Sequence, residues 1–94
     1  GNYAEARAFM RDQMELAKRA FGADHPTTLD FQWGYSRAFR LDKDISAEQL
    51  AEVATTLEKT LEISQRVCGR EHPRTCSVRG ELSMAREEFA RRGA

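Results

Sequence analysis

Apolar residues recur every three or four positions along most of this chain, which is the period of an amphipathic α-helix. The first segment carries the stripe Tyr3, Ala6, Met10, Met14, Ala17 and Phe21. The third segment carries the stripe Leu50, Val53, Leu57, Leu61, Ser64 and Cys68. The sequence contains no alternating run of Val, Ile and Thr of the kind that is typical of strands. The pattern therefore predicts an all-α fold.

Residues that end and begin helices divide the chain into four segments. Gly22 and Gly69 suit the left-handed conformation that follows a helix end. Pro26 and Pro73 suit the first position of the next helix, where the missing N–H costs nothing. We therefore expect four helices, over approximately residues 2–21, 26–41, 47–68 and 73–91.

The connection between the second and third helices is polar from Asp42 to Asp44. Ser46 and Gln49 then fit a capping box, in which each side chain satisfies a backbone N–H at the helix start. The second helix carries the apolar residues Leu29, Trp33, Tyr35, Ala38 and Phe39. The fourth has Cys76, Leu82, Ala85 and Phe89 on its apolar side.

The sequence also repeats itself after 47 residues. The turn residues Gly22, His25, Pro26 and Thr28 align with Gly69, His72, Pro73 and Thr75. The apolar stripes keep the same offset, because Tyr3, Ala6, Met10 and Met14 align with Leu50, Val53, Leu57 and Leu61. An internal repeat of this length predicts antiparallel helix–turn–helix units that stack on one another.

These residues resemble the kinesin light chain type of tetratricopeptide repeat. Gly-x-x-His-Pro-x-Thr occurs twice between helices, and Gly1, Tyr3 and Ala6 match the Gly-x-Tyr-x-x-Ala opening of a second helix. The segment from Leu57 to Ile63 matches that family's second-helix core. The resemblance implies that residues 1–94 form a single tetratricopeptide-like domain, a fragment of a right-handed α-solenoid. We expect it to be a segment of a longer array or a small subunit, because solenoids need about three repeats.

Two departures from that pattern stand out. The offset of 47 is longer than the family's usual repeat by about five residues, and the surplus lies near Leu41 to Ser46. The family's Asn-Asn-Leu-Ala core, which in relatives holds the backbone of a bound peptide, is replaced in both copies. Trp33 and Gly34 occupy the two asparagine positions in one copy, and Gly80 and Glu81 occupy them in the other.

Cys68, His72 and Cys76 form a C-x3-H-x3-C pattern that invites a metal or redox interpretation. A structural zinc site takes four ligands, and only three candidates lie here. The repeat places Phe21 and Leu29 at the two cysteine positions, so we interpret both cysteines as small buried hydrophobes. A disulfide between them stays an alternative. We predict no metal and no cofactor, and we expect both histidines to cap the helix that follows.

The second helix also carries a candidate contact surface for a partner. Asp30, Trp33, Arg37 and Arg40 lie on one helical face, and Met84 is at the repeat-equivalent position of Arg37. The first helix of each pair supplies the concave surface in the related repeats, and Trp and Arg are enriched at binding hot spots. The alternative is that Trp33 packs under a neighbouring helix.

Charge and composition exclude several other functions. The 94 residues include 15 basic and 15 acidic ones, with no basic block of the kind a nucleic-acid binder carries. No apolar run is long enough for a membrane span. The cluster Arg86 to Arg92 is mixed in sign, which favours an exposed final turn. Two cysteines do not make a disulfide framework, so we expect the cytoplasm or another reducing compartment.

These observations predict a non-catalytic module or scaffold that binds a partner protein. The alternative is a structural or linker subunit docked in a large multi-protein assembly, whose partner would cover the Tyr3–Met10 and Leu82–Phe89 stripes. We do not expect an enzyme, because no carboxylate is paired with a nucleophile or a metal triad.

Overall fold

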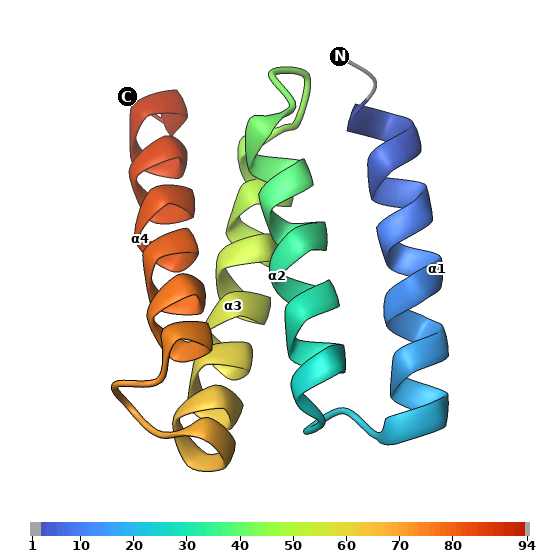
Figure 1. Cartoon of the computed structure of the whole chain (residues 1–94). Helices are drawn as coiled ribbons and strands as arrows, with labels where there is room; N and C mark the ends of the chain where they lie inside the picture. The colour runs from blue at the N-terminus through green and yellow to red at the C-terminus, as the bar shows by residue number, and fades with distance from the viewer. Residues whose placement is uncertain (1–2, 94) are drawn as a thin grey trace.

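The computed structural model describes residues 3–93, and in that range it consists of four α-helices joined by short turns (Figure 1). Their bounds are α1 Tyr3–Phe21, α2 Pro26–Leu41, α3 Ala47–Cys68 and α4 Pro73–Gly93. The predicted all-α class is confirmed, and the last helix runs two residues further than expected. The predicted helical position 2 and the motif residue Gly1 lie outside the described residues.

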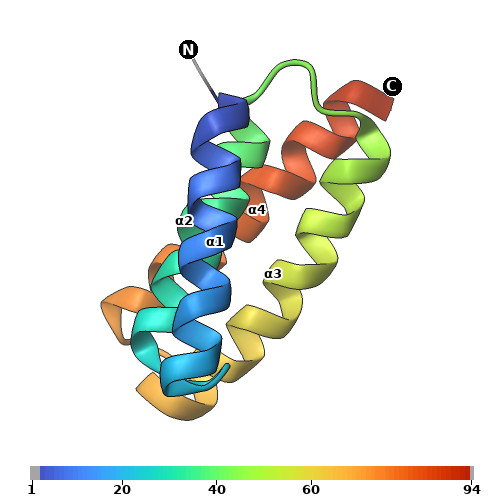
Figure 2. The ribbon, with the colours of Figure 1, turned by 90° about the vertical axis from the view of Figure 1, so that its right-hand side faces the viewer.

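The helices stack so that α1 and α4 form opposite ends of the molecule, with α2 and α3 between them (Figure 1). Helix α2 contacts all three others, whereas α4 contacts α3 and α2. Within the described residues, α1 packs against α2 alone, so its outer side faces solvent (Figure 2). None of the described helices is long and apolar enough to cross a membrane.

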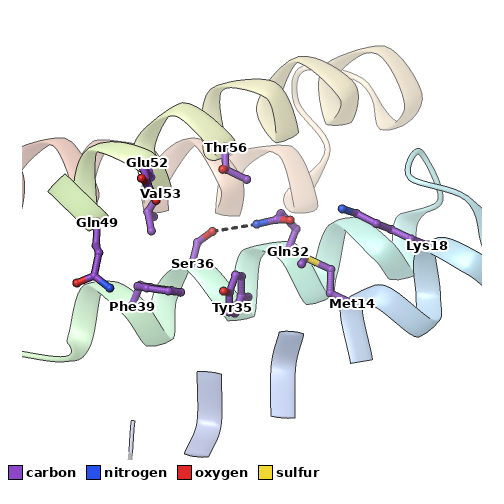
Figure 3. Close-up of a pocket in the computed structure, with 10 residues that line it drawn as sticks. All are labelled: Met14, Lys18, Gln32, Tyr35, Ser36, Phe39, Gln49, Glu52, Val53 and Thr56. Atoms are coloured by element: carbon purple, nitrogen blue, oxygen red, sulfur yellow. Dashed lines mark hydrogen bonds between the residues drawn. The ribbon is translucent and has the colours of Figure 1, made fainter. Parts of the chain in front are cut away.

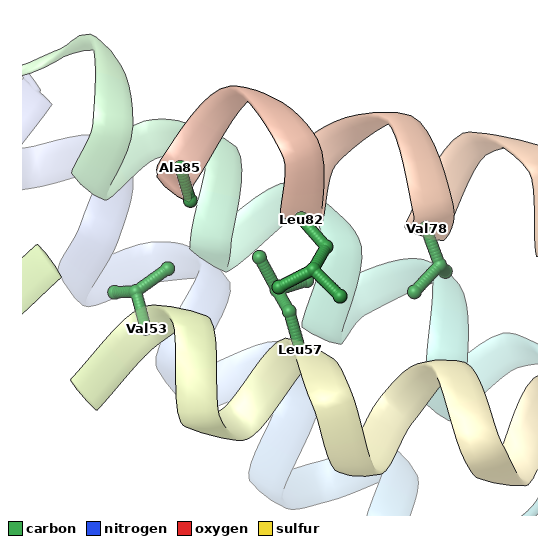
Figure 4. Packing of buried hydrophobic residues seen from close by; sticks show 5 residues of the cluster. All are labelled: Val53, Leu57, Val78, Leu82 and Ala85. Atoms are coloured by element: carbon green, nitrogen blue, oxygen red, sulfur yellow. The ribbon is translucent and has the colours of Figure 1, made fainter. Parts of the chain in front are cut away.

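The core is densest where α3 meets α4. Its buried cluster consists of Val53, Leu57, Val78, Leu82 and Ala85 (Figure 4). Leu57 is fully buried, and Trp33, Phe39, Ala54 and Leu61 pack against the edge of the cluster. The third-helix stripe was predicted well because α3 is covered from two sides, by α2 and by α4.

The stripes of the two end helices were predicted less well. Phe21 is 56% exposed and Phe89 is 41% exposed, and Cys76 is exposed rather than buried. Val78 is fully buried, although the predicted stripe omitted it. For Cys76, which is the repeat equivalent of Leu29, the reason is that α3 covers the side of α2 where Leu29 lies, while no described helix covers the equivalent side of α4.

The turn between α1 and α2 and the turn between α3 and α4 have the same construction. Gly22 and Gly69 have φ angles of 94° and 102°. With ψ at 155°, Gly69 lies in an extended region open essentially to glycine alone, rather than in the left-handed helical region that we expected. His25 accepts a hydrogen bond from the backbone N–H of Thr27, 3.1 Å from Nδ1. In the second turn His72 accepts one from Arg74 at 3.0 Å, so each ring satisfies a free N–H at a helix start.

The hydroxyls of the two repeat-turn threonines differ in partner. Thr28 donates to the carbonyl of Gly22 at 2.8 Å. Thr75 instead contacts Ser64, with 2.8 Å between the hydroxyl oxygens and 3.2 Å to the Ser64 carbonyl. Both threonines are buried, so these bonds satisfy hydroxyls that would otherwise be costly to bury. Each threonine therefore ties the start of one helix to the chain before it.

The longer connection between α2 and α3 is held by side chains of α1 and α4, the helices at the two ends of the molecule. The predicted capping box is present at the start of α3. Asp42 pairs with Arg7 of α1, and Arg92 of α4 donates to the carbonyls of Ile45 and Asp42. Arg92 also bonds Glu88 at 3.0 Å. The expectation of a merely exposed final turn was therefore wrong for these two residues, because the surplus turn residues give Arg92 carbonyls to bind.

Candidate partner-binding groove between α2 and α4

The candidate contact residues of α2 lie directly opposite α4. Helices α2 and α4 run side by side, and their equivalent residues are 47 positions apart. Each residue of α2 faces a residue of α4 that lies about one helical turn before its own equivalent. Asp30 reaches Arg74, and Trp33 reaches Ser77, both 44 positions later in the chain. We call the depression between these helices the α2–α4 groove.

Two adjacent hollows make up the groove. One has a volume of about 260 Å³ and is lined by Asp30, Trp33, Arg74, Ser77 and Val78. The other has a volume of about 300 Å³ and is lined by Trp33, Arg37, Arg40, Ser77, Gly80, Glu81 and Met84. Trp33 borders both, so it stands at the centre of the groove. The second hollow exists partly because Gly80 has no side chain, and a Cβ there would meet no atom within 4 Å.

Trp33 packs and lines the groove at the same time. Its indole N–H donates to the carbonyl of Ser77 at 3.2 Å, and its ring is half-buried against the α3–α4 core. The guanidinium of Arg37 lies over the ring, 5.5 Å from its centroid. The two interpretations of Trp33 are therefore compatible, since one edge of the ring is held by α4 and another borders the hollows.

Two charged residues of the predicted surface are bonded within the molecule. Arg40 binds the carboxylate of Glu81 with two bonds, of 2.5 and 3.2 Å, and Glu81 is only 3% exposed. Asp30 likewise takes two bonds from Arg74, of 2.7 and 3.1 Å. The Asp30 carboxylate raises the pKa of the Arg74 guanidinium, so this charge is permanent. Both pairs brace α2 against α4.

Arg37 and Met84 are the predicted residues that stay available to a partner. Arg37 is exposed, and among the described residues no carboxylate lies within 4.0 Å of it. Met84 is 48% exposed on the opposite wall. The groove therefore has an aromatic floor, a cationic rim on α2 and a flexible thioether on α4.

The cysteine–histidine pattern is not assembled into a metal site. Within residues 3–93 no group of three potential metal ligands comes together. Nδ1 of His72 is occupied by the helix-capping bond, and both cysteines are free thiols. Cys68 replaces Phe21, whose ring stacks on His25 at 4.6 Å in the first turn. In the second turn Arg74 lies beside Cys68 instead, with its guanidinium 3.8 Å from the sulfur.

A separate hollow of about 280 Å³ is lined by residues of α1, α2 and α3 (Figure 3). Gln32 donates to Ser36 across its floor at 3.4 Å, and both residues are buried. Lys18, Gln49 and Glu52 line its edges. Its lining is more polar than that of the groove, and none of the residues predicted to bind a partner lies in it.

Sequence reasoning missed Arg74 and Glu81, which complete the walls of the groove. A signal for them exists in the sequence. Opposite charges occur 44 positions apart at Asp30 and Arg74, and 41 apart at Arg40 and Glu81. These offsets equal the repeat length less one or two helical turns, which is the spacing expected of facing residues on neighbouring parallel helices.

Comparison with known proteins agrees with this repeat. A family model described as "Tetratricopeptide repeat" matches residues 1–27 and again residues 48–74. The two matches are offset by 47 residues, and each covers a second helix and the turn after it. No curated protein and no solved structure matches the chain.

Proposed function

Because the chain belongs to the tetratricopeptide repeat family, we propose that it is a non-catalytic module that binds a partner protein in the α2–α4 groove. Tetratricopeptide repeats generally mediate protein–protein interaction, and stacked helix pairs offer extended concave surfaces for it. The observation that carries the proposal is the group formed by Trp33, Arg37 and Met84 around the hollow beside Gly80.

The chemistry of the groove favours a particular kind of partner segment. An apolar or aromatic side chain fits beside Trp33 and Met84, where the floor is ring and thioether. A carboxylate next to it in the partner fits Arg37, the exposed cation of the rim. Trp and Arg at the centre of a depression are the residue types that dominate binding energy. The Arg40–Glu81 and Asp30–Arg74 pairs hold the walls in place before binding, which lowers the entropic cost of association.

The finer assignment to the kinesin light chain type is part of this proposal. The two His-Pro-x-Thr turns support it. At the paired asparagine positions, however, this chain has Trp33 with Gly34 and Gly80 with Glu81, and Glu81 is already bound to Arg40. We infer that this groove recognises partner side chains more than partner backbone.

Photo-crosslinking tests the proposed site. A photoreactive residue at Met84, in the protein as it occurs in its own cells, should give a covalent adduct with a partner. The same photoreactive residue in place of Val67, which is similarly exposed on α3, should give no adduct. Arg37→Glu should abolish the Met84 adduct, whereas the matched Arg66→Glu on α3 should leave it intact. Equal adducts from both positions, or an adduct indifferent to Arg37→Glu, would show that the groove is not the binding site.

A structural or linker role in a larger assembly is the second candidate. Large apolar side chains on α1 favour it, because Phe9 is 61% exposed and Phe21 is 56% exposed. On α4 the stripe proposed for coverage is only partly open, since Leu82 is buried by α3 while Phe89 is exposed. A monomer that unfolds in one sharp transition, measured by light scattering and thermal melting, would count against an obligate docked subunit.

A further inference from the structure

Helix α2 borders a second depression, which lies between α1 and α3. Both of these helices pack against α2, but their backbones do not come close to each other (Figure 2). Two hollows, of about 280 and 170 Å³, lie in the space between them. Lys18, Gln32 and Thr56 line both hollows, so the hollows adjoin. We call the combined depression the α1–α3 trough.

The trough is enclosed by helices of this chain, and a further helix at either end of the stack would not fill it. Its α1 wall consists of Met14 and Lys18. A helix placed before α1 as α2 is placed before α3 would lie on the side of Phe9, because Phe9 is the repeat equivalent of Thr56. Phe9 and Met14 are about 140° apart around the helix. At the other end of the stack, α4 contributes no residue to the lining.

The floor of the trough carries a buried carboxamide whose oxygen has no partner among the described residues. Gln32 is 8% exposed, and its Nε2 donates to Ser36 at 3.4 Å (Figure 3). In residues 3–93 no wholly buried polar side-chain atom lacks a hydrogen bond, so the unpaired Oε1 of Gln32 opens into the hollows. A carboxamide has two N–H donors and an acceptor oxygen. Gln32 can therefore offer one N–H and its oxygen together, which matches the C=O and N–H of a peptide backbone.

The shape of the trough fits an extended segment. Its lining on α2 runs from Thr28 to Phe39, a length of about 16 Å at about 1.5 Å per helical residue. An extended chain advances about 3.3 Å per residue, so about five residues cover this length.

The charges of the trough are separated along its length. Lys18 on α1 and Lys59 on α3 line the smaller hollow. Among the described residues no carboxylate pairs with Lys59, and Lys18 reaches only Glu15, an exposed neighbour on its own helix, at 3.8 Å. Glu52 lines the larger hollow, two helical turns from Lys59. The trough therefore favours carboxylates at the lysine end and uncharged residues at the other.

We propose that the α1–α3 trough binds an extended acidic segment of a partner protein. Gln32 pairs with the backbone of that segment, and Lys18 and Lys59 bind two of its carboxylates. Successive side chains of an extended chain point to opposite sides, so two adjacent acidic residues reach the two lysine-bearing walls. This surface is separate from the α2–α4 groove and does not rest on the function proposed for it.

NMR titration of the chain with capped five-residue peptides tests the proposal. Glu-Glu-Ala-Ala-Ala and its reverse, Ala-Ala-Ala-Glu-Glu, cover both directions along the trough. One of them should shift the side-chain N–H signals of Gln32, with a dissociation constant of about 1 mM, a weak affinity that suits so short a segment. Lys-Lys-Ala-Ala-Ala and its reverse should not. The absence of a Gln32 shift up to about 10 mM peptide, or equal binding of the lysine peptides, would overturn the proposal.

Two further arms test the charge and the backbone separately. Lys59→Glu should weaken binding of the acidic peptide at least about tenfold, whereas Lys43→Glu, a matched change of an exposed lysine outside the trough, should leave it unchanged. Equal effects of the two variants would overturn the charge assignment.

The backbone arm changes the peptide and leaves the protein intact. Replacing each peptide N–H in turn by an ester oxygen should weaken binding about three- to tenfold at one position, the contribution of one hydrogen bond. Esters that all bind as the parent peptide does would overturn the role of Gln32. A peptide that shifts the Trp33 indole signal and leaves Gln32 in place would overturn the proposal and leave the function of the α2–α4 groove standing.

Discussion

Removing one partner of the Arg40–Glu81 pair should cost more stability than removing one partner of any other ion pair among residues 3–93. Glu81 is 3% exposed and Arg40 18% exposed, and two bonds join them across the groove. Removing one partner of a buried pair leaves an uncompensated charge and costs roughly 3–5 kcal/mol. Because Arg40 keeps some contact with water, we expect Arg40→Met to cost about 3 kcal/mol, at the lower end of that range.

A domain of 94 residues has an unfolding free energy on the order of 5–14 kcal/mol, so the variant should still fold. Its melting temperature should fall by about 12–24 °C, since 1 kcal/mol corresponds to about 4–8 °C at this size. The double variant Arg40→Met, Glu81→Met buries no charge and should lie within about 1 kcal/mol of the wild type. Urea titration followed by far-ultraviolet circular dichroism measures all three unfolding free energies.

Arg66→Met is the matched control. Arg66 pairs with Asp24 at 3.2 Å, but both side chains are more than half exposed, so its loss should cost no more than about 0.5 kcal/mol. If Arg40→Met costs as little as Arg66→Met, the pair does not brace α2 against α4. If the double variant is less stable than Arg40→Met alone, the cost does not come from an uncompensated buried charge.

Four further predictions concern the packing and the long turn. Leu57→Ala, at the fully buried centre of the α3–α4 core, should lower the unfolding free energy by about 2–5 kcal/mol in the same titration. Gly80→Ala should raise it by about 1 kcal/mol, because the new methyl meets open space within a helix. Gly34→Ala should gain less, because its Cβ would lie 2.3 Å from the Met10 methyl and displace it; an equal gain would show that α1 does not need this close approach. The backbone N–H of Asp44, followed by the guanidinium of Arg7, holds the pKa of Asp42 below its ordinary 3.8. The stabilisation from this depressed pKa is complete above the unfolded value and is lost as pH falls through the folded one. Melting temperatures of the wild type and Asp42→Asn should therefore differ most above about pH 4 and converge in acid, and a difference that does not vary with pH would contradict this.

The fold could be predicted because it rests on local and repeated signals. Helical periodicity, the glycine–proline turns and the Ser46–Gln49 box act within a few residues, and the 47-residue offset identifies the stacking. Burial at the end helices could not be predicted in the same way. Cys76 and Leu29 occupy equivalent positions in the repeat, but only Leu29 is covered by another helix. Equivalent residues therefore share a conformation without sharing an environment.

The groove was predicted in part for a similar reason. The spacing of Asp30, Trp33, Arg37 and Arg40 placed them on one face, and that face does meet α4. Which of these residues remain exposed depends on partners that are 41 to 44 positions away. Helical spacing within α2 gives no information about those partners. It therefore could not show that Asp30 and Arg40 form ion pairs with α4 while Arg37 stays exposed.

The most direct measurement of the central claim uses the single tryptophan as a reporter of the groove. The indole N–H of Trp33 gives one signal in an amide nitrogen–proton NMR spectrum, because the chain has no other tryptophan. Titration with the partner segment recovered by crosslinking at Met84 should shift that signal together with the amide of Gly80. Arg37→Glu should weaken binding at least tenfold, about 1.4 kcal/mol. Binding that leaves the Trp33 signal in place while shifting Gln49 and Glu52, beside the other hollow, would contradict the account.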